Sequence, residues 1–383
     1  MDKHVVIVDF NHLIHTYFYS QHRLSVDVVN LDTGNTVSKD TTIQNGTIKS
    51  IYRWSNGGSF PTAVCFDRPC PARKAYFGAI AKELGYEPKD NAEYKGSRVS
   101  MQSEMFTASR DTEMILSRAG VSCYACEGYE ADDIIMACVE RAKKKYPGMH
   151  IDIITGDADM LALVDEQVSV YFRSKKGTFA EDKAYEKNKY IEVTPRNYSN
   201  IVGSLSDFKG FNMAYNTILL HKLIRGDKSD EYVCKELSKM YPATKWNAMI
   251  MEAEADGVDF GSLFRYGRPV MEIWNRESGE RFNGTMAEAM ASPEKPNLYQ
   301  KITNPVELNN IIEFLRKYSK FSEEQLGKVE KLYWLMNLNM PYVNEDKFAC
   351  RRAYVVNEKN DINTYDEVEL KKSAYEELKI SLK

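Results

Sequence analysis

The chain has 383 residues, a length that suits one large α/β domain with a helical annexe or two medium-sized domains. Hydrophobic residues make up 43% and charged residues 28%, with a formal net charge of −4, so there is ample material for a buried core. No apolar run approaches the roughly 20 residues that span a bilayer, and the seven cysteines are scattered; this excludes a membrane protein and a secreted disulfide scaffold.

The first half of the chain predicts alternating strands and helices. Residues 4–10 (HVVIVDF) form a continuous apolar run typical of a strand buried on both faces. No signal peptide precedes this run, so we expect a cytoplasmic protein. The predicted strands and helices, in chain order, lie at residues 4–10, 11–19, 62–66, 103–119, 121–126, 130–146 and 150–154. Strands and helices that alternate over short connections indicate βαβ units and a mainly parallel sheet.

The second half of the chain predicts mostly helix. Residues 165–200 combine a β-rich stretch with a polar loop, and helical spacing dominates from about residue 205. Residues 253–300 are rich in Gly, Asp, Glu and Pro, which indicates an irregular insertion. We expect three parts: a core at 1–235 with an arch region at about 70–120, a helical region at 236–345, and a charged tail at 346–383 that ends in an amphipathic helix.

Acidic residues gather where predicted strands end and helices begin. Seven of them are Asp9, Asp67, Glu130, Asp132, Asp133, Asp157 and Asp159, and two more, Asp227 and Asp230, are spaced i,i+3 in RGDKSD. In a parallel sheet these ends open onto one edge, so the acids should converge there. Like charges in one cleft repel unless cations neutralise them. Oxygen ligands without a His or Cys cluster favour Mg²⁺ or Mn²⁺, and two such ions about 4 Å apart promote phosphodiester hydrolysis.

The remaining charge and the ordinary roles of acids bear on this hypothesis. Setting nine of the 55 acidic residues aside leaves fewer acids than the 51 basic residues, so the rest of the surface can meet a polyanion. A single aspartate at a strand end is more often a turn or helix cap. Acids in the first helical turn stabilise a helix by about 0.3–1 kcal/mol each. Acids from several segments on one edge favour metal binding instead.

Several motifs occur together in a characteristic order and spacing: VDFNHLI, CFD, EYKGSR, YEADDIIM, TGDADMLAL and LIRGDKSDE. In this combination the chain resembles the phage and bacterial 5′ nucleases, the family of flap endonucleases, 5′→3′ exonucleases and the nuclease domain of bacterial DNA polymerase I. GDKSDE is most similar to the branch of T-even phage ribonuclease H. The resemblance covers roughly residues 1–235.

The resemblance implies a fold, a cofactor and a set of roles. The fold is a mixed, mainly parallel sheet flanked by helices, with a helical C-terminal region. The cofactor is a pair of Mg²⁺ ions, for which Mn²⁺ substitutes. The ligands of this pair correspond to Asp9, Asp67, Glu130, Asp132 and Asp157, with Asp67 and Asp157 central to catalysis. The outer ligands correspond to Asp133, Asp159, Asp227 and Asp230. Lys95 and Arg98 correspond to the catalytic basic pair that grips the scissile phosphate at the base of a helical arch.

Further residues of the arch region are candidates for nucleic-acid binding. Arg73 and Lys74 continue the phosphate-facing surface. The aromatic residues either stack on unpaired bases or pack inside the arch and core, and they are Tyr76, Phe77, Tyr86 and Tyr94. The chain departs from the family after GDKSD, where it lacks the glycine-rich G-x-G-x-G segment, and in the longer interval between Arg73 and Lys95.

We therefore expect a Mg²⁺-dependent 5′ nuclease of phage origin, a monomer that acts in replication or repair on DNA with 5′ ends, flaps or RNA–DNA primers. The charged tail is a candidate for docking a clamp or a single-strand-binding protein. Three alternatives stay open: a PIN-type ribonuclease, a haloacid-dehalogenase-like phosphatase and a non-catalytic junction-binding protein. The phosphatase needs a second acid two positions after Asp9, where this chain has Asn11.

Overall fold

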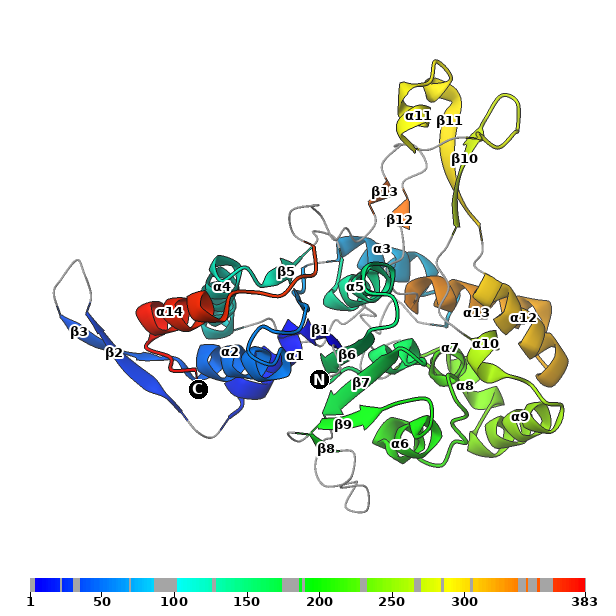
Figure 1. Cartoon of the computed structure of the whole chain (residues 1–383). Coiled ribbons are helices and arrows are strands. Elements are labelled where there is room, and N and C mark those ends of the chain that lie inside the picture. Colours follow the sequence, from blue (N-terminus) through cyan, green and yellow to red (C-terminus); the bar gives the residue numbers. More distant parts are fainter. Residues whose placement is uncertain are drawn as a thin grey trace. The chain divides into compact units, whose positions relative to one another are not determined.

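The computed structural model describes fifteen segments of the chain: residues 4–20, 23–29, 35–68, 70–85, 102–125, 129–173, 186–187, 190–227, 233–264, 270–283, 286–303, 306–336, 342–343, 350–351 and 361–382. The chain divides into two compact units (Figure 1). The first unit consists of Met1–Pro69, Arg98–Asn197 and Val355–Lys383, and the second of Cys70–Ser97 and Tyr198–Tyr354. This grouping differs from the boundary expected near residue 235 and from a separate C-terminal tail.

A sheet forms the centre of the first unit, in the order β5-β4-β1-β6-β7-β9-β8. The strands are β1 (His4–Asp9), β4 (Thr62–Cys65), β5 (Ser122–Tyr124), β6 (His150–Thr155), β7 (Val168–Arg173), β8 (Glu186–Lys187) and β9 (Tyr190–Val193). The pairs among β5, β4, β1, β6 and β7 are parallel, whereas β9 pairs antiparallel with β7 and β8. The prediction of a mixed, mainly parallel sheet is confirmed.

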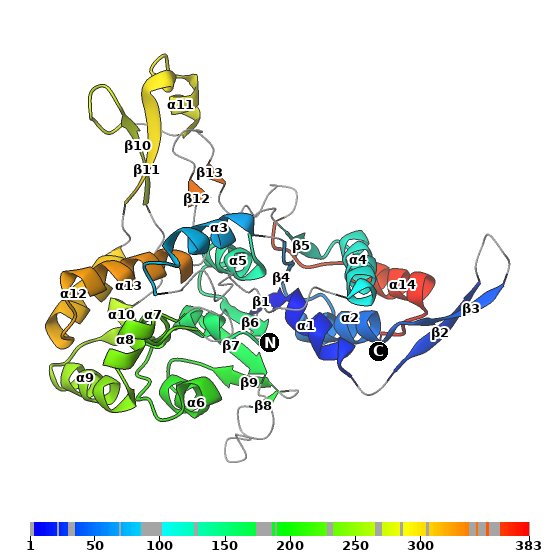
Figure 2. The ribbon, with the colours of Figure 1, turned by 180° about the vertical axis from the view of Figure 1, so that it is seen from behind.

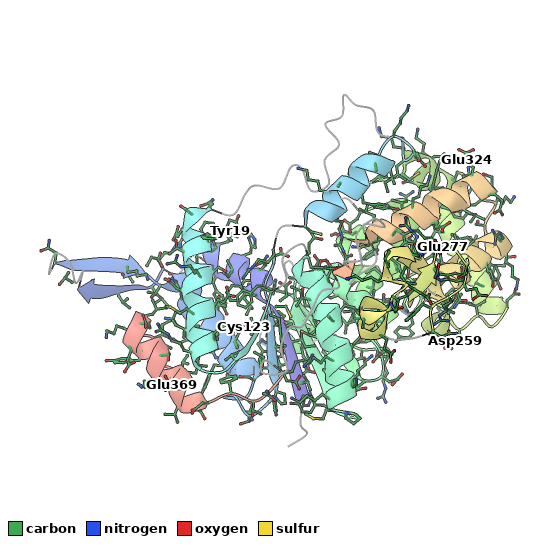
Figure 3. All side chains as sticks on the ribbon, turned by 90° about the horizontal axis from the view of Figure 1, so that it is seen from above. Tyr19, Cys123, Asp259, Glu277, Glu324 and Glu369 are labelled. Carbon is green, nitrogen blue, oxygen red and sulfur yellow. The ribbon has the colours of Figure 1, made fainter. Side chains whose placement is uncertain are left out.

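Helices cover both faces of this sheet. They are α1 (Phe10–Phe18), α2 (Thr42–Trp54), α4 (Ser103–Arg118), α5 (Ala131–Lys145) and α14 (Glu367–Leu378). Val6 and Val8 of β1 share a buried core with α1, α2, α4 and α14. Side chains alternate along a strand, so the equally buried Val5 and Ile7 face the other side, where α5 packs on β1 and β4. Figure 3 shows α4 and α14, with Glu369 labelled on α14, beside each other.

The predicted elements of the first half are present, with ends that differ by a few residues. Two elements between α1 and β4 were not predicted: helix α2 and an antiparallel hairpin of β2 (Ser25–Val29) and β3 (Thr36–Asp40). Figure 2 shows this hairpin extending beyond the helices of the first unit. Its strands, SVDVV and TVSKD, are short and mix valines with polar residues, so they lack the long apolar run by which a buried strand is predicted.

The second unit is mainly helical, as predicted. Its helices are α3 (Pro71–Ile80), α6 (Tyr198–Ser204), α7 (Ile218–Arg225), α8 (Lys235–Met240), α9 (Ala243–Ala255), α10 (Phe260–Leu263), α11 (Met286–Ala291), α12 (Val306–Tyr318) and α13 (Glu323–Met336). A short pair, β12 (Tyr342–Val343) and β13 (Cys350–Arg351), follows. No helix in the described part of the chain is both long and apolar enough to cross a membrane.

The insertion expected at residues 253–300 is more regular than predicted. After α10, β10 (Val270–Asn275) and β11 (Leu298–Thr303) pair antiparallel over their whole length. A small cluster of buried residues, Ile273, Ala289 and Leu298, joins this hairpin to α11. The few apolar residues that form this cluster are diluted by polar ones, so composition alone indicated an irregular segment.

The C-terminal segment is also not a free tail in its described part, residues 361–382. Ile362, Leu370 and Leu378 are buried, and the last two belong to the core shared by α2 and α4. Asp361 forms ion pairs of 2.7 Å with Arg141 and 2.8 Å with Lys145 at the end of α5. The sequence predicted a charged tail that ends in an amphipathic helix, and α14 is a helix with one buried face. The fold adds the core on which that face packs.

Candidate metal centre

Parallel pairing brings the carboxyl ends of three strands to one edge of the sheet. β1 lies between β4 and β6. Asp9, the last residue of β1, is in register with the last residue of β4, and Asp67 follows two positions later. Val8 is in register with Ile154, which places Thr155 beside Asp9 on the neighbouring strand. The first predicted acids therefore start from the same edge.

Asp9 is a buried carboxylate held from two sides. The residue is only 6% exposed. Oδ1 accepts a hydrogen bond of 3.1 Å from the backbone N–H of His12, and Oδ2 accepts one of 2.8 Å from the hydroxyl of Thr155. Burial, together with the charges of Asp157 and Asp67, raises the pKa of Asp9 to about 7, against the lowering effect of the two hydrogen bonds. A cation at this edge would favour the ionised form.

Asp67 connects the end of β4 to two other elements. Its Oδ1 accepts a hydrogen bond of 2.6 Å from the backbone N–H of Ala131, the first residue of α5. Its Oδ2 accepts one of 2.7 Å from the side-chain amide of Asn11 on α1. The residue itself is exposed. A carboxylate at the start of α5 also interacts favourably with the helix dipole.

Three carboxylates gather most closely. Oxygen atoms of Asp132, Asp157 and Asp159 all lie within 4.8 Å of one another, and all three residues are half-buried. Asp132 comes from the first turn of α5, and the other two follow β6. Asp157 is the N-cap residue of the short helix η2 (Ala158–Leu163), and its Oδ1 accepts a hydrogen bond of 2.9 Å from the N–H of Asp159. This turn keeps two acids on one side of the chain.

The other acids at the start of α5 have different surroundings. Glu130 is the half-buried N-cap residue of the helix. Asp133 is fully buried, and its carboxylate accepts a hydrogen bond of 3.1 Å from the backbone N–H of Glu130, as in a capping box. Neighbouring residues of a helix point about 100° apart, so Asp132 and Asp133 cannot face the same way. The geometry gives Asp133 a helix-capping role.

A family model supplies the deciding comparison. Residues 4–190 match the model of the 5′–3′ exonuclease N-terminal resolvase-like domain. These residues belong to the 5′ nuclease family. The matched 5′ nuclease domain contains the whole sheet edge described above and the acids from Asp9 to Asp159.

Curated relatives match part of the 5′ nuclease domain. DNA polymerase I of Caldicellulosiruptor bescii is 32% identical over 147 residues, which are 38% of this chain and 15% of the polymerase. The 5′–3′ exonuclease of Buchnera aphidicola is 26% identical over 115 residues, which are 30% of this chain and 38% of the exonuclease. The matches thus span well under two thirds of the relatives' own length.

Two solved structures are also similar to the chain, at low sequence identity. The T5 D15 protein co-crystallised with metal ions has a TM-score of 0.43 at 13% identity, covering 87% of this chain and 100% of that one. The catalytic core of Rad2 in complex with DNA substrate has a TM-score of 0.31 at 11% identity, covering 86% of this chain and 90% of that one.

Not all of the predicted site residues belong to the described part of the first unit. Asp227 is in the second unit, where it forms a buried ion pair with Lys222; their side chains are 7% and 8% exposed. Several predicted residues fall outside the described part of the chain: Tyr86, Tyr94, Lys95, Arg98 and Asp230. Their roles remain predictions.

The predicted nucleic-acid-binding residues of α3 differ in exposure. Arg73 is only 3% exposed, whereas Lys74 is exposed. The hydroxyl of Tyr76 donates a hydrogen bond of 3.2 Å to the carbonyl of Lys331 on α13, and burial raises the pKa of Tyr76 to about 12. Phe77 is 1% exposed. Phe77 is therefore packed in the interior, whereas Tyr76 is half-buried and base stacking by Tyr76 stays a prediction.

Three residues at the metal centre were not singled out by the sequence for this role. Asn11 and Thr155 bind Asp67 and Asp9, as described above. The third residue is His12, whose Nε2 lies 2.9 Å from the hydroxyl of Tyr190. Burial lowers the pKa of His12 to about 3, so its ring is neutral at physiological pH. A Cβ atom on Gly156 would lie 2.3 Å from the ring of His12, so only glycine fits there. The glycine of T-G-D was the available signal.

The donor set of the 5′ nuclease domain fits a hard divalent cation. The acids offer oxygen atoms only, which suits Mg²⁺, Mn²⁺ or Ca²⁺ better than a soft metal. Asp132, Asp157 and Asp159 are close enough to share one ion, and the carboxylate of Asp9 is buried near Asp157. Their mutual repulsion is the electrostatic cost that a bound cation removes.

Proposed function

We propose that the chain is a divalent-metal-dependent 5′ nuclease, a 5′→3′ exonuclease or flap endonuclease that hydrolyses DNA phosphodiesters near 5′ ends or junctions. One observation carries this proposal. The oxygens of Asp132, Asp157 and Asp159 lie within 4.8 Å of one another, inside the segment that matches the exonuclease family model. An acidic cluster alone is common on protein surfaces, and the family match alone does not establish activity. Together they favour metal-dependent hydrolysis.

In this proposal the acidic residues hold the metal ions, and their hydrogen-bond partners orient them. Asp132, Asp157 and Asp159 would hold one Mg²⁺ ion, and Asp9, Asp67 and Glu130 would complete a site for a pair, with Mn²⁺ as a substitute. When bound, such ions supply Lewis acidity at the reacting phosphate. The hydrogen bonds from Thr155, Asn11 and the N–H of Ala131 orient Asp9 and Asp67 before substrate arrives. Fixed ligands need no rearrangement during the reaction.

The substrate side of the proposal rests on cations. Lys95 and Arg98 would grip the scissile phosphate, and the exposed Lys74 would extend this surface, because guanidinium and ammonium groups bind phosphate oxygens. The relatives named above are a DNA polymerase I and a 5′–3′ exonuclease, which favours a DNA substrate with a 5′ end, a flap or an RNA–DNA primer. We also propose that the protein is of phage origin and acts as a monomer in the cytoplasm. Its proposed partner is a clamp or a single-strand-binding protein.

The test compares substrates and metal. A 5′-labelled flap, a nicked duplex, a single strand and a matched RNA strand are each incubated with Mg²⁺, with Mn²⁺ and with EDTA. We expect cleavage of the DNA substrates near the 5′ end or junction with Mg²⁺ or Mn²⁺, and none with EDTA. Cleavage restricted to RNA would favour the ribonuclease. Hydrolysis of a small phosphomonoester with intact DNA would favour the phosphatase, and tight junction binding without cleavage would favour the binding protein.

A further inference from the structure

Thr155 occupies an unusual place at the metal centre. It is the last residue of β6 and is fully buried. Its hydroxyl donates a hydrogen bond of 2.8 Å to Oδ2 of Asp9 and accepts one of 3.0 Å from the backbone N–H of Asp157. A hydroxyl has a single proton. Since the N–H of Asp157 can only donate, the carboxylate of Asp9 is the acceptor for that proton.

This one hydroxyl therefore connects two acids from different strands. Asp9 ends β1, and Asp157 follows β6 as the first residue of the turn that also presents Asp159. The N–H of His12 holds the other oxygen of Asp9, so its carboxylate is fixed at both ends. Any change that frees the Thr155 hydroxyl would loosen Asp9 and the backbone of Asp157 together.

A buried threonine hydroxyl is not always engaged in this way. Thr112 on α4 is also fully buried, and its hydroxyl has no hydrogen-bond partner among the described residues. A strand accommodates a β-branched side chain at position 155 for packing reasons alone, and valine would satisfy these equally well. The two hydrogen bonds of Thr155 are what valine cannot provide.

We propose that Thr155 is a positioning residue that sets the affinity of the acidic cluster for divalent cations. This inference rests on the proposed metal-dependent function, and it assigns to Thr155 a contribution separate from that of the ligands. Groups that orient metal ligands typically change metal affinity or activity by about 10–100-fold when removed. The effect should appear in metal binding without any nucleic acid.

The experiment titrates the full chain with Mn²⁺ by calorimetry in the absence of DNA. Thr155→Val removes the hydroxyl while keeping the shape, Thr155→Ser keeps the hydroxyl, and Thr112→Val is the matched control that removes a buried hydroxyl elsewhere in the same unit. We expect Thr155→Val to bind Mn²⁺ about 10–100-fold more weakly, and Thr155→Ser and Thr112→Val to stay within about threefold of the unaltered protein. If Thr155→Val fails to fold, the contrast between Thr155→Ala and Thr155→Ser takes its place.

A second readout separates positioning from general stability. In cleavage assays, Thr155→Val should raise the Mg²⁺ concentration for half-maximal rate, with much of the rate recovered at excess Mg²⁺. Equal Mn²⁺ affinity in Thr155→Val and the unaltered protein, or failure of Thr155→Ser to preserve it, would overturn the inference. So would an unaltered protein that binds no Mn²⁺. If Mn²⁺ binds in a Thr155-dependent way but no nucleic acid is cut, the proposed nuclease function fails and the inference stands.

Discussion

Two aspartates of the central sheet are equally buried but have opposite electrostatic surroundings. Asp9, at the carboxyl end of β1, is 6% exposed, and Asp152, near the start of β6, is 4% exposed. Asp152 lies 3.1 Å from the imidazole of His4 and 3.6 Å from that of His150, two groups that can carry positive charge. Asp9 receives hydrogen bonds from the neutral Thr155 hydroxyl and a backbone N–H.

This difference shows how one sheet can use a buried acid in two ways. Around Asp9 the nearby charges are those of Asp157 and Asp67, which add to burial in raising its pKa to about 7. A buried carboxylate is costly unless it is paired. At the amino ends of the strands histidines offer that pairing, whereas at the carboxyl ends the acids crowd together. The second arrangement becomes favourable with a bound cation.

The largest effect should come from removing an acid of the crowded edge. Asp157→Asn should lower the rate of flap cleavage by on the order of 10³-fold, because one ligand of the proposed metal site contributes several kcal/mol to the transition state. Initial rates with 5′-labelled flap at saturating Mg²⁺ measure this effect. The exposed Asp27 on β2 provides a control, and Asp27→Asn should cleave at the normal rate. Normal cleavage by Asp157→Asn would remove that residue from the site.

A third buried aspartate extends the comparison to the second unit. Asp227 is paired with Lys222, so Lys222→Met should destabilise the protein by about 3–5 kcal/mol by leaving a buried charge without this partner. Chemical denaturation measures the loss, and Asp227→Asn combined with Lys222→Met should recover part of it. If Lys222→Met instead changes the Mg²⁺ requirement with little loss of stability, Asp227 acts as the metal ligand that the sequence predicts.

The raised pKa of Asp9 predicts a pH-dependent metal affinity. Below about pH 7 the Asp9 carboxyl is protonated, and a cation must displace that proton, so Mn²⁺ affinity should fall by about tenfold per pH unit. In the metal-free protein, Asp9 should make the free energy of unfolding fall, not rise, as the pH increases. The folded pKa lies above the ordinary 3.8, so Asp9 favours the folded state most below that value, and this contribution is lost as the pH rises to about 7.

Thermal denaturation between pH 5 and 8, with and without Mn²⁺, measures both trends. The stabilisation by Mn²⁺ should be larger at pH 8 than at pH 5. Asp9→Asn should flatten the pH dependence of the metal-free protein. A metal effect that is constant across this range would show that Asp9 does not couple to the ion.

The smallest effect is expected at the opposite edge of the sheet. Asp152→Asn should lower stability by about 1–3 kcal/mol, since it removes a buried charge that faces His4 and His150. Cleavage at saturating Mg²⁺ should change by less than about threefold, because Asp152 precedes Thr155 along β6 by a distance of about 10 Å. A loss of cleavage comparable to that of Asp157→Asn would erase the distinction between the two edges.

The sequence predicted the parts of the fold and site that local patterns determine. Long apolar runs located β1 and β6, and helical spacing located α5, so the edge carrying Asp9 and Asp157 could be expected. Adjacent acids were harder to separate. Asp132 and Asp133 look alike in the sequence, but the helix turns one toward the cluster and buries the other in a capping hydrogen bond.

Contacts between distant segments could not be predicted. Thr155 and Asp9 are far apart in the sequence, as are Asn11 and Asp67, and only strand order brings each pair together. The same reason explains why the packing of the C-terminal segment was not predicted: Leu370 stands between charged residues in the sequence, yet it is buried in the core. Sequence patterns indicate which residues are buried or form charged sites, and the topology determines which of these residues contact one another.

Diffraction from crystals soaked in Mn²⁺, recorded for the anomalous signal of manganese, tests the central claim most directly. We predict a peak about 2.0–2.3 Å from carboxylate oxygens of Asp132, Asp157 and Asp159, with no comparable peak in crystals of Asp157→Asn. Manganese bound only elsewhere, or the same peak in both crystals, would contradict the account.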